Sequence, residues 1–333
     1  TNLCLRNLDL TLTDAPAASG GYAGTSYQGA ISANYLNNVV LEGLKIGQVA
    51  DLGVKIEGSS GVRVLGCEFR ETGACAVAAL KSHDLEFADC RIGYAGFSTP
   101  SAAGVLLTGD RIHVHHTSFH DAGYAGIFVD GDKSVVVFNK VWRVMLKMAD
   151  GSALYTNGTN GLVRRNWASE VGVGPQSRAP AYYLDDNTAG YTIEGNVAIV
   201  KNWLLHVHNA AANTIRNNIF VAADDARITF QGASATVLEN NVINAGGRII
   251  FDPIQGQMAA LRGNLLHSGS GTVDLLGRSA AAPLDLNGNF ILKDLAFVDL
   301  AHGDVRFRPD APALKSGIPQ PPAPNELGPR PGR

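Results

Sequence analysis

The chain has 333 residues, of which 17% are charged and 38 are glycine, and its formal net charge is −3 at pH 7. The sequence lacks the basic stripe that draws proteins to nucleic acid, so no nucleic-acid partner is expected. It also lacks a run of about 18 apolar residues, so no membrane-spanning segment is expected. Frequent glycine and asparagine favour many turns over long helices.

The first residues already read as a strand, from Leu3 to Leu8, without the basic and apolar regions of a signal peptide. We therefore expect a chain that starts after a removed signal or inside a longer protein, and a location outside the cell or in the periplasm. A glycine-rich insertion follows, from Ala18 to Gln28.

A phrase of alternating apolar residues, one small polar residue and an apolar pair then recurs. Its polar position is held in turn by Asn7, Gly43, Gly66, Asp89, His116, Asn139, Asn166, Asn196, Asn218, Asn241, Asn264 and Asn289. From Gly43 onward the steps are 22 to 30 residues long, which is the range of a solenoid repeat. Strand-like runs of period two, such as 125–129 and 227–231, lie between the phrases.

These repeats predict an all-β chain: a single right-handed parallel β-helix of about twelve turns over residues 1–317. A leucine-rich repeat would show a leucine framework with a helical half, and a propeller would need blades of about 40 residues. The stretch 304–315 closes the last turn. The Pro/Gly-rich tail, 318–333, is expected to be a strap or a disordered leader.

In such a coil, equivalent residues stack about 4.8 Å apart. Asparagine tolerates left-handed backbone, and its amide can pass hydrogen bonds from turn to turn, so the recurring asparagines are expected to form a structural ladder. Cys67 and Cys90 fall just after this position in neighbouring turns, where they are either bridged or stacked as buried thiols.

The repeat is most irregular on either side of Asn166. One long step contains 150–157, and the next contains 171–180 followed by 181–187. Insertions in a solenoid form loops on one face and often carry its function. These irregular turns, with the segment 203–209 in the next turn, therefore form the candidate site.

Counting back from the ladder places Thr156, Asp186 and His208 in one column. The neighbouring column holds Tyr155, Asp185 and Val207. Acids and imidazoles gathered in a groove can perform general acid and base catalysis. The catalytic candidates are Asp150, Asp185 and Asp186, and the substrate-binding candidates are Tyr155, Asn157, Arg178, Tyr183, Trp203, His206 and His208.

Structural roles remain open for several of these side chains. Asp150 precedes a glycine and suits a turn, and one aspartate of the Asp185–Asp186 pair suits an Asx turn. The tyrosines can stack, and the two histidines can face solvent. A separate group, His113, His115, His116 and His120, is expected to be structural. No metal is predicted, and no nucleotide cofactor is implied because no glycine-rich loop leads from a strand into a helix.

Three phrases, at 150–157, 183–196 and 206–220, resemble bacterial right-handed β-helix glycoside hydrolases, most closely the family that includes α-L-fucosidases and xylanases. The resemblance extends to the closing stretch 306–315. It implies hydrolysis of a poly- or oligosaccharide, with Asp150 and either Asp185 or Asp186 as the catalytic pair. The sequence departs from the family at Asn187, where glycine is usual, and in its short upstream insertions, which leave the second wall of the groove undefined.

Two other functions fit the same fold. A polysaccharide lyase or epimerase acting on uronates would need a basic residue, for which Lys147 and Arg178 are the nearest candidates. A non-catalytic β-helix would only bind glycans. The sequence indicates neither the sugar nor the oligomeric state.

Overall fold

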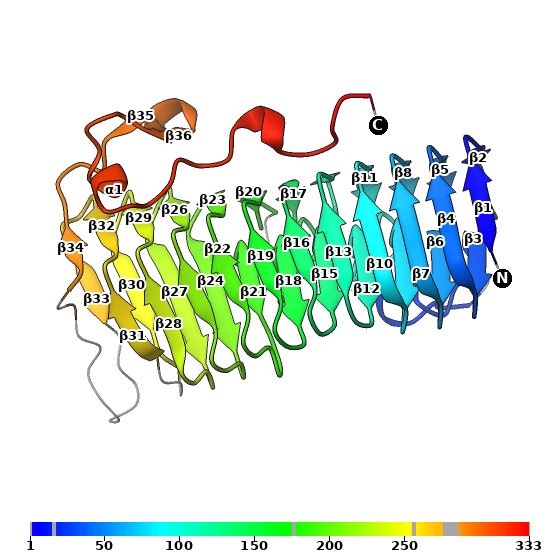
Figure 1. Cartoon of the computed structure of the whole chain (residues 1–333), viewed down its shortest axis with the longest axis horizontal. Coiled ribbons are helices and arrows are strands. Elements are labelled where there is room, and N and C mark those ends of the chain that lie inside the picture. The colour runs from blue at the N-terminus through cyan, green and yellow to red at the C-terminus, as the bar shows by residue number, and fades with distance from the viewer. Residues whose placement is uncertain are drawn as a thin grey trace.

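The computed structural model describes residues 2–14, 18–174, 178–254, 258–275, 286 and 288–332. They form an elongated coil in which successive short strands join three parallel sheets in turn (Figure 1). The described strands number 11 in sheet A, 12 in sheet B and 11 in sheet C. The chain is therefore an all-β, right-handed parallel β-helix, as expected, with about eleven turns instead of twelve.

Sheet A contains β1 Leu3–Arg6, β4 Asn37–Glu42, β7 Ser60–Leu65, β10 His83–Ala88, β13 Ile112–His115, β16 Val135–Val137, β19 Leu162–Arg164, β22 Thr192–Glu194, β25 Thr214–Arg216, β28 Thr236–Glu239 and β31 Met258–Arg262. Sheet B contains β2 Asp9–Thr11, β5 Lys45–Val49, β8 Glu68–Thr72, β11 Arg91–Ala95, β14 Ser118–His120, β17 Lys140–Val144, β20 Trp167–Val171, β23 Val197–Val200, β26 Ile219–Ala222, β29 Val242–Ala245, β32 Leu265–Ser268 and β34 Phe290–Ile291. Sheet C contains β3 Gly29–Asn34, β6 Leu52–Glu57, β9 Val77–Leu80, β12 Val105–Thr108, β15 Ile127–Asp130, β18 Leu154–Asn157, β21 Tyr182–Leu184, β24 Trp203–His208, β27 Ala226–Gln231, β30 Ile249–Asp252 and β33 Val273–Leu275.

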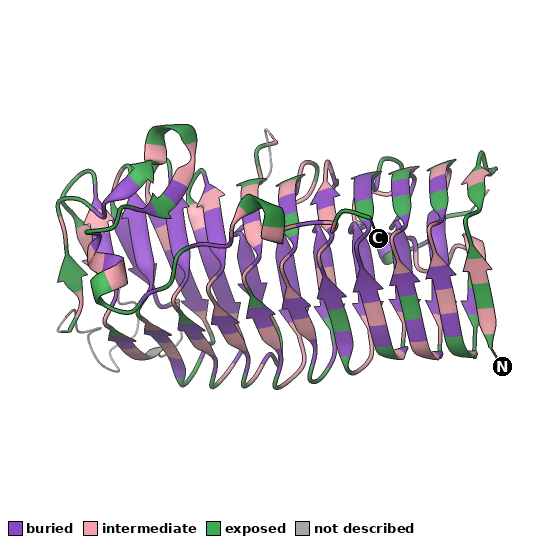
Figure 2. Cartoon of the chain, turned by 45° about the horizontal axis from the view of Figure 1, so that its top comes forward, coloured by how far each residue is buried: buried purple, intermediate pink, exposed green. Residues whose placement is uncertain are grey.

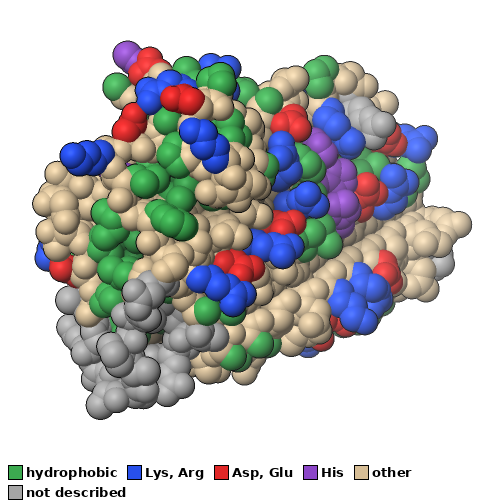
Figure 3. Space-filling model, turned by 60° about the vertical axis from the view of Figure 1, so that its left-hand side comes forward, with side chains coloured by type: hydrophobic (Ala, Val, Ile, Leu, Met, Phe, Trp, Pro, Cys, Tyr) green, Lys and Arg blue, Asp and Glu red, His purple; other side chains and the backbone are tan. Residues whose placement is uncertain are grey.

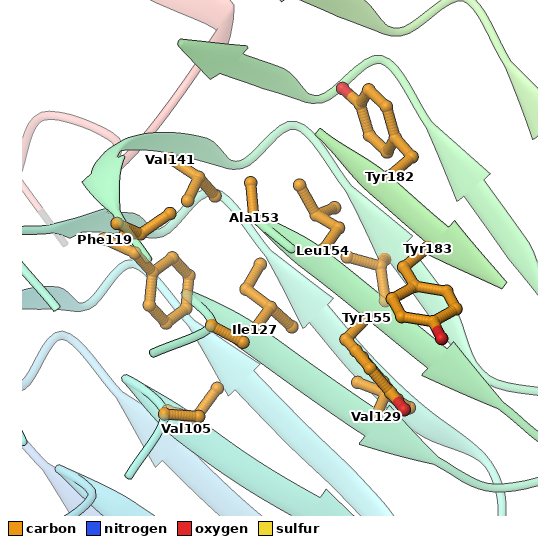
Figure 4. Close-up of a cluster of buried hydrophobic side chains, with 14 of the residues drawn as sticks. Val105, Phe119, Ile127, Val129, Val141, Ala153, Leu154, Tyr155, Tyr182 and Tyr183 are labelled. Carbon is orange, nitrogen blue, oxygen red and sulfur yellow. The ribbon is translucent and has the colours of Figure 1, made fainter. Parts of the chain in front are cut away.

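The core lies inside the coil, where alternate residues of all three sheets meet. Val105, Ile127 and Leu154 occupy the same position in β12, β15 and β18, and all three are buried (Figure 4). Because every turn repeats this arrangement, apolar side chains pile on their equivalents and form one continuous core. Side chains at the intervening positions therefore point to the outer faces of the sheets.

The recurring phrase contains two neighbouring columns, whereas the sequence interpretation merged them into one. In the ladder column, the side-chain amides of Asn139, Asn166, Asn196, Asn218, Asn241 and Asn264 each donate to the Oδ1 of the next asparagine, over 2.8 to 3.0 Å. The series ends at Asn289, and the six donating asparagines are fully buried.

Five earlier members belong to the column just before the ladder, so their assignment to the ladder was wrong. Left-handed backbone, with φ between 48° and 61°, is shared by Asn7, Gly43, Gly66, Asp89 and His116. The ladder position in the N-terminal half is held by Cys67, Cys90 and Thr117, and the Thr117 amide donates to Asn139 Oδ1 over 3.0 Å. Asparagine is found in both columns: Asn217 has the left-handed backbone, and Asn218 belongs to the ladder. The sequence pattern therefore did not reveal that the two columns differ by one residue.

Cys67 and Cys90 are free, buried thiols. The backbone amide of Cys67 donates to Cys90 Sγ over 3.3 Å, which takes the place of an asparagine contact. Of the two sequence alternatives, stacked thiols and a bridge, the structure shows the first.

The C-terminal region covers part of the coil from outside. After β34, the antiparallel strands β35 Phe297–Asp299 and β36 Asp304–Phe307 and the short helix α1 Pro312–Lys315 contribute apolar side chains that pack on sheet B. Residues 318–332 then run back along the coil as a strap (Figures 1 and 2). Ion pairs hold the strap: Arg165 with Glu326 at 2.8 Å, and Asp89 with Arg330 at 2.5 Å. The domain boundary at residue 317 stays a prediction.

Long loops gather at the corners between sheets B and C. They include 96–104, 145–153 and the described parts of 12–28 and 172–181. The first of these insertions contains a 3₁₀ turn, Tyr22–Gly24, and two further such turns, Leu300–His302 and Pro324–Glu326, lie in the C-terminal region. Within the described ranges, no helix has the length and apolar character needed to cross a membrane.

Candidate active site

The candidate site lies on the outer face of sheet C, where β18, β21 and β24 are neighbours. Tyr155 pairs in register with Tyr183, and Tyr183 pairs with His206. Their rings stack along the coil, with centroids 4.8 Å and 4.6 Å apart, and Phe128 extends the stack at 4.4 Å from Tyr155. The hydroxyls of Tyr155 and Tyr183 lie on the same side of the sheet, whereas Tyr182 points away from them (Figure 4).

The columns expected from the sequence were wrong in this region. Thr156 pairs with Leu184, and Leu184 pairs with Val207, so Asp186 does not share a column with Thr156. These three residues precede the next ladder asparagine by 10, 12 and 11 positions. Because the corner between sheets C and A varies in length from turn to turn, a constant count from the ladder misaligned the strands.

The corrected register brings Asp185 beside His208. One carboxylate oxygen of Asp185 accepts a hydrogen bond from the Tyr155 hydroxyl, and the other lies 2.5 Å from His208 Nδ1. Burial, and then the hydrogen bond to Asp185, raise the pKa of Tyr155 far above its usual value. The phenol therefore stays protonated and donates. With both oxygens engaged and its side chain only 14% exposed, Asp185 is fixed in one orientation.

Asp150 reaches the same place from the loop between β17 and β18. Its carboxyl Oδ1 lies 3.5 Å from the Tyr183 hydroxyl, and its backbone carbonyl accepts a hydrogen bond from the Tyr124 hydroxyl over 2.7 Å. Burial, and then the negative charges of Asp185 and Asp150, raise the pKa of Tyr183. Both carboxyl groups therefore lie near enough to this phenol to act on it.

The chain can bring Asp150 to this place only because Gly151 follows it. A Cβ atom at position 151 would lie 2.5 Å from Cε2 of Tyr124, closer than side chains tolerate. The glycine thus allows Tyr124 to pack on the loop and to hold the Asp150 carbonyl. Tyr124 was not predicted as a site residue. It lies 26 residues before Asp150 in the chain, and no local sequence pattern links the two.

Asp186 occupies the rim of the site. Its side chain is 58% exposed, and its Oδ1 accepts a hydrogen bond from the Asn209 amide over 2.8 Å. Among the described side chains, Asp185, Asp186 and His208 are the group whose ligand atoms could hold a metal ion, since they lie within 4.8 Å of one another. The hydrogen bonds of Asp185 already use both of its oxygens, so the carboxylate is satisfied without a metal.

A cavity of about 350 Å³ opens beside Asp150. It is lined by Ala149, Asp150, Gly151, Arg178, Pro180, Tyr183, Trp203, His206, His208 and Gln231. Of the expected substrate-binding residues, all line it except Tyr155 and Asn157. Tyr155 instead donates a hydrogen bond to Asp185. Asn157 lies at the end of β18, and its buried Oδ1 has no hydrogen-bond partner. Gln231 was missed, because its phrase looks like an ordinary repeat.

Trp203 and His206 form a rigid side of the cavity. The indole Nε1 of Trp203 donates to the Leu205 carbonyl and to the Thr229 hydroxyl, both over 3.1 Å. The guanidinium of Arg227 lies over the same ring, 5.5 Å from its centroid. His206 is 6% exposed, and its Nδ1 lies 2.6 Å from Thr229 Oγ1. An aromatic surface held this firmly loses little entropy when a ligand binds.

Burial, and then the nearby imidazole of His208, lower the pKa of His206 to about 4. The ordinary pKa of histidine is about 6.5, so between these values the unfolded chain binds more protons than the folded one. We expect acidification from pH 7.5 to 4.5 to remove about 2–3 kcal/mol of stability through this group. His206→Gln should lose that part of the pH dependence in urea unfolding measured at both pH values.

The matched control is His302→Gln, on an exposed turn of the C-terminal region. This variant should keep the wild-type pH dependence. Equal pH dependence in wild type and His206→Gln would contradict the prediction.

The upstream histidines do not line the cavity. His113 and His115 lie on β13 with ring centroids 4.3 Å apart, and His115 Nε2 is 3.3 Å from Glu86. His116, at the corner, stacks on Phe138, and His120 stacks on Trp142 of sheet B. Figure 3 shows histidines gathered beside cationic and acidic side chains on one face. Lys147 also lies away from the cavity lining, with its Nζ donating to the Phe97 carbonyl over 2.8 Å.

Three parallel sheets that form the sides of one coil define a right-handed β-helix protein, and the polar site lies on the outer face of one of them. The chain belongs to the family described as the right-handed beta helix region, whose model matches residues 52–220. The right-handed β-helix part of the resemblance is thus confirmed, while the glycoside hydrolase activity and the narrower family of fucosidases and xylanases stay predictions. A comparison with curated proteins finds no match.

Three solved structures are similar to part of this chain. One, described as a glycoside hydrolase, is 15% identical with a TM-score of 0.49, over 63% of this chain and 37% of that one. PfbA, a surface adhesin of Streptococcus pneumoniae, is 12% identical with a TM-score of 0.47, over 64% and 61%. The GH136 lacto-N-biosidase from Eubacterium ramulus is 12% identical with a TM-score of 0.41, over 86% and 48%. The aligned regions thus span 37% to 61% of these longer structures.

Proposed function

We propose that the protein is a glycoside hydrolase that cleaves a poly- or oligosaccharide with Asp150 and Asp185. The observation that carries this proposal is that Asp150 lines a cavity with a rigid aromatic side, while Asp185 lies directly behind it, beside the lining residue His208. Glycosidases use two such carboxyls, one to protonate the leaving oxygen and one to act in its ionised form.

The surroundings of the two aspartates favour different roles. Asp150 lines the cavity from an exposed loop, where its carboxyl can reach the leaving oxygen of a bound glycan, so we assign it the role of general acid. Asp185 accepts hydrogen bonds at both oxygens, from Tyr155 and from the His208 side, which suits the ionised partner. Asp186, held at the rim by Asn209, then serves only to orient substrate or His208.

The remaining lining residues suit a sugar ligand. Trp203, Tyr183 and His206 offer apolar surface, while Arg178 and Gln231 offer hydrogen-bond donors. A polymeric substrate of this kind is met outside the cytoplasm, so we place the protein in the periplasm or outside the cell. By resemblance, fucosylated and xylan-type glycans are the first substrates to try.

A polysaccharide lyase is the second candidate, because Arg178 lines the cavity and could neutralise the carboxylate of a uronate. Lys147, the other basic candidate, is engaged with the Phe97 carbonyl.

The test is incubation of the protein with fucosylated xyloglucan, glucuronoarabinoxylan and polygalacturonate, followed by assay of reducing ends and of ultraviolet absorbance. The hydrolase proposal expects reducing ends without absorbance. New absorbance from an unsaturated product would replace it with the lyase. Binding to a glycan without any product, under all conditions, would leave only the glycan-binding alternative.

A further inference from the structure

The N-terminal insertion between β2 and β3 is seated on later turns of the coil. In Figure 1 the dark blue segment there runs beneath the neighbouring turns toward the middle of the molecule. The Ala23 amide donates to Ser101 Oγ over 3.1 Å, and the Cys75 thiol donates to the Ala23 carbonyl over 3.5 Å. Gly24 packs so closely that an added Cβ atom would lie 2.6 Å from the Cβ of Ala74. The insertion is therefore held in place.

Tyr22 of this insertion extends to the candidate active site. Its ring meets that of Tyr124 edge to face, with centroids 6.4 Å apart, and Tyr124 holds the Asp150 carbonyl. Burial raises the pKa of Tyr22, and among the smaller causes are the charges of Asp150 and Asp185. Tyr22 and Tyr124 thus form an aromatic wall beside the loop that carries Asp150. Tyr22 is 56% exposed, and neither ring is among the residues that line the cavity.

The cavity extends to one side of this wall. Its lining begins at 149–151, and every other lining residue comes from a later turn: Arg178 and Pro180, then Tyr183, and finally the residues of β24 and Gln231 of β27. On the N-terminal side, the outer face of sheet C is filled by Phe128 stacked on Tyr155. Asp150 therefore stands at the N-terminal end of the cavity.

We propose that the site acts on the end of a glycan chain and releases a short unit, with Tyr22 as the residue that limits its depth. This inference rests on the proposed glycosidase function. Cleavage inside a polymer requires room for sugars on both sides of the catalytic carboxyls, whereas this cavity continues on one side only. Its volume of about 350 Å³ is near the lower end of the usual range for ligand pockets, about 300–1,000 Å³.

The test uses the hexasaccharide of whichever polysaccharide is degraded, with products sized by mass spectrometry early in the reaction. Wild type should release only a mono- or disaccharide. Tyr22→Ala removes the wall and should raise internal cleavage, seen as trisaccharide, by about tenfold or more. Tyr22→Phe keeps the ring and should keep the wild-type products. Tyr35→Ala, at an exposed tyrosine outside the cavity lining, is the matched control and should change nothing.

Trisaccharide as an early wild-type product would overturn the inference while leaving the glycosidase proposal intact. Wild-type products from Tyr22→Ala, with an unchanged unfolding midpoint, would overturn the role of Tyr22. Failure to degrade any polysaccharide would instead contradict the glycosidase function, and the inference would be lost with it.

Discussion

Asp185→Asn is expected to lower kcat by about 10²–10⁴-fold, the range typical for loss of a positioned acid or base. The amide keeps the shape of the side chain, but it cannot act in ionised form and it turns one acceptor into a donor facing Tyr155 or His208. Asp150→Asn should have an effect of similar size, because an amide cannot protonate the leaving group. The measurement is kcat on the substrate found in the glycan screen.

Asp186→Asn provides the comparison for both variants. Its carboxyl is exposed at the rim and contacts Asn209, so we expect a loss within about tenfold, mainly in KM. Thermal unfolding of each variant shows whether the coil is intact. A larger loss in Asp186→Asn than in Asp185→Asn would contradict the assignment of roles.

Asn196→Ala is expected to destabilise the coil strongly. The Asn196 side chain accepts from the backbone and side-chain amides of Asn166, and it donates to the Val163 carbonyl and Asn218 Oδ1 over 2.9 and 3.0 Å. Alanine leaves these fully buried partners unsatisfied. Each such group costs about 1–3 kcal/mol, so we expect a total loss of about 3–5 kcal/mol.

The readout is the midpoint of urea unfolding, followed by circular dichroism. Asn202→Ala is the matched control, because Asn202 is exposed between β23 and β24 and its backbone carbonyl, not its side chain, accepts from the Arg227 amide. A shift in Asn196→Ala no larger than in Asn202→Ala would show that the ladder contributes little.

The coil was predictable because its cause is repeated in the sequence. Each turn must place apolar residues inward and a polar side chain at a tight corner, so the same phrase returns at nearly constant spacing. The C-terminal asparagines accordingly occupy the ladder as expected, from Asn139 to Asn289. The error in the N-terminal half arose where glycine, cysteine and threonine replace asparagine and only the backbone angles separate the two columns.

The arrangement of the site was less predictable. The phrases around Asp150 and Asp185 differ visibly from the repeat, and the structure places their turns beside one cavity. Their register depends on corner lengths that change by one or two residues, and a shift of this size alters every contact across neighbouring strands. The contact of Tyr22 with Tyr124, between residues about a hundred positions apart, has no counterpart in any local pattern.

By itself the sequence therefore determined the class of fold, the axis of stacking and the turns where the repeat is interrupted, because short-range patterning repeats in every coil. Only the tertiary structure decided which aspartate is enclosed by Tyr155 and His208, and on which side of Asp150 the cavity lies. Those outcomes depend on the lengths and packing of loops from distant turns, and such contacts form only once the coils are stacked.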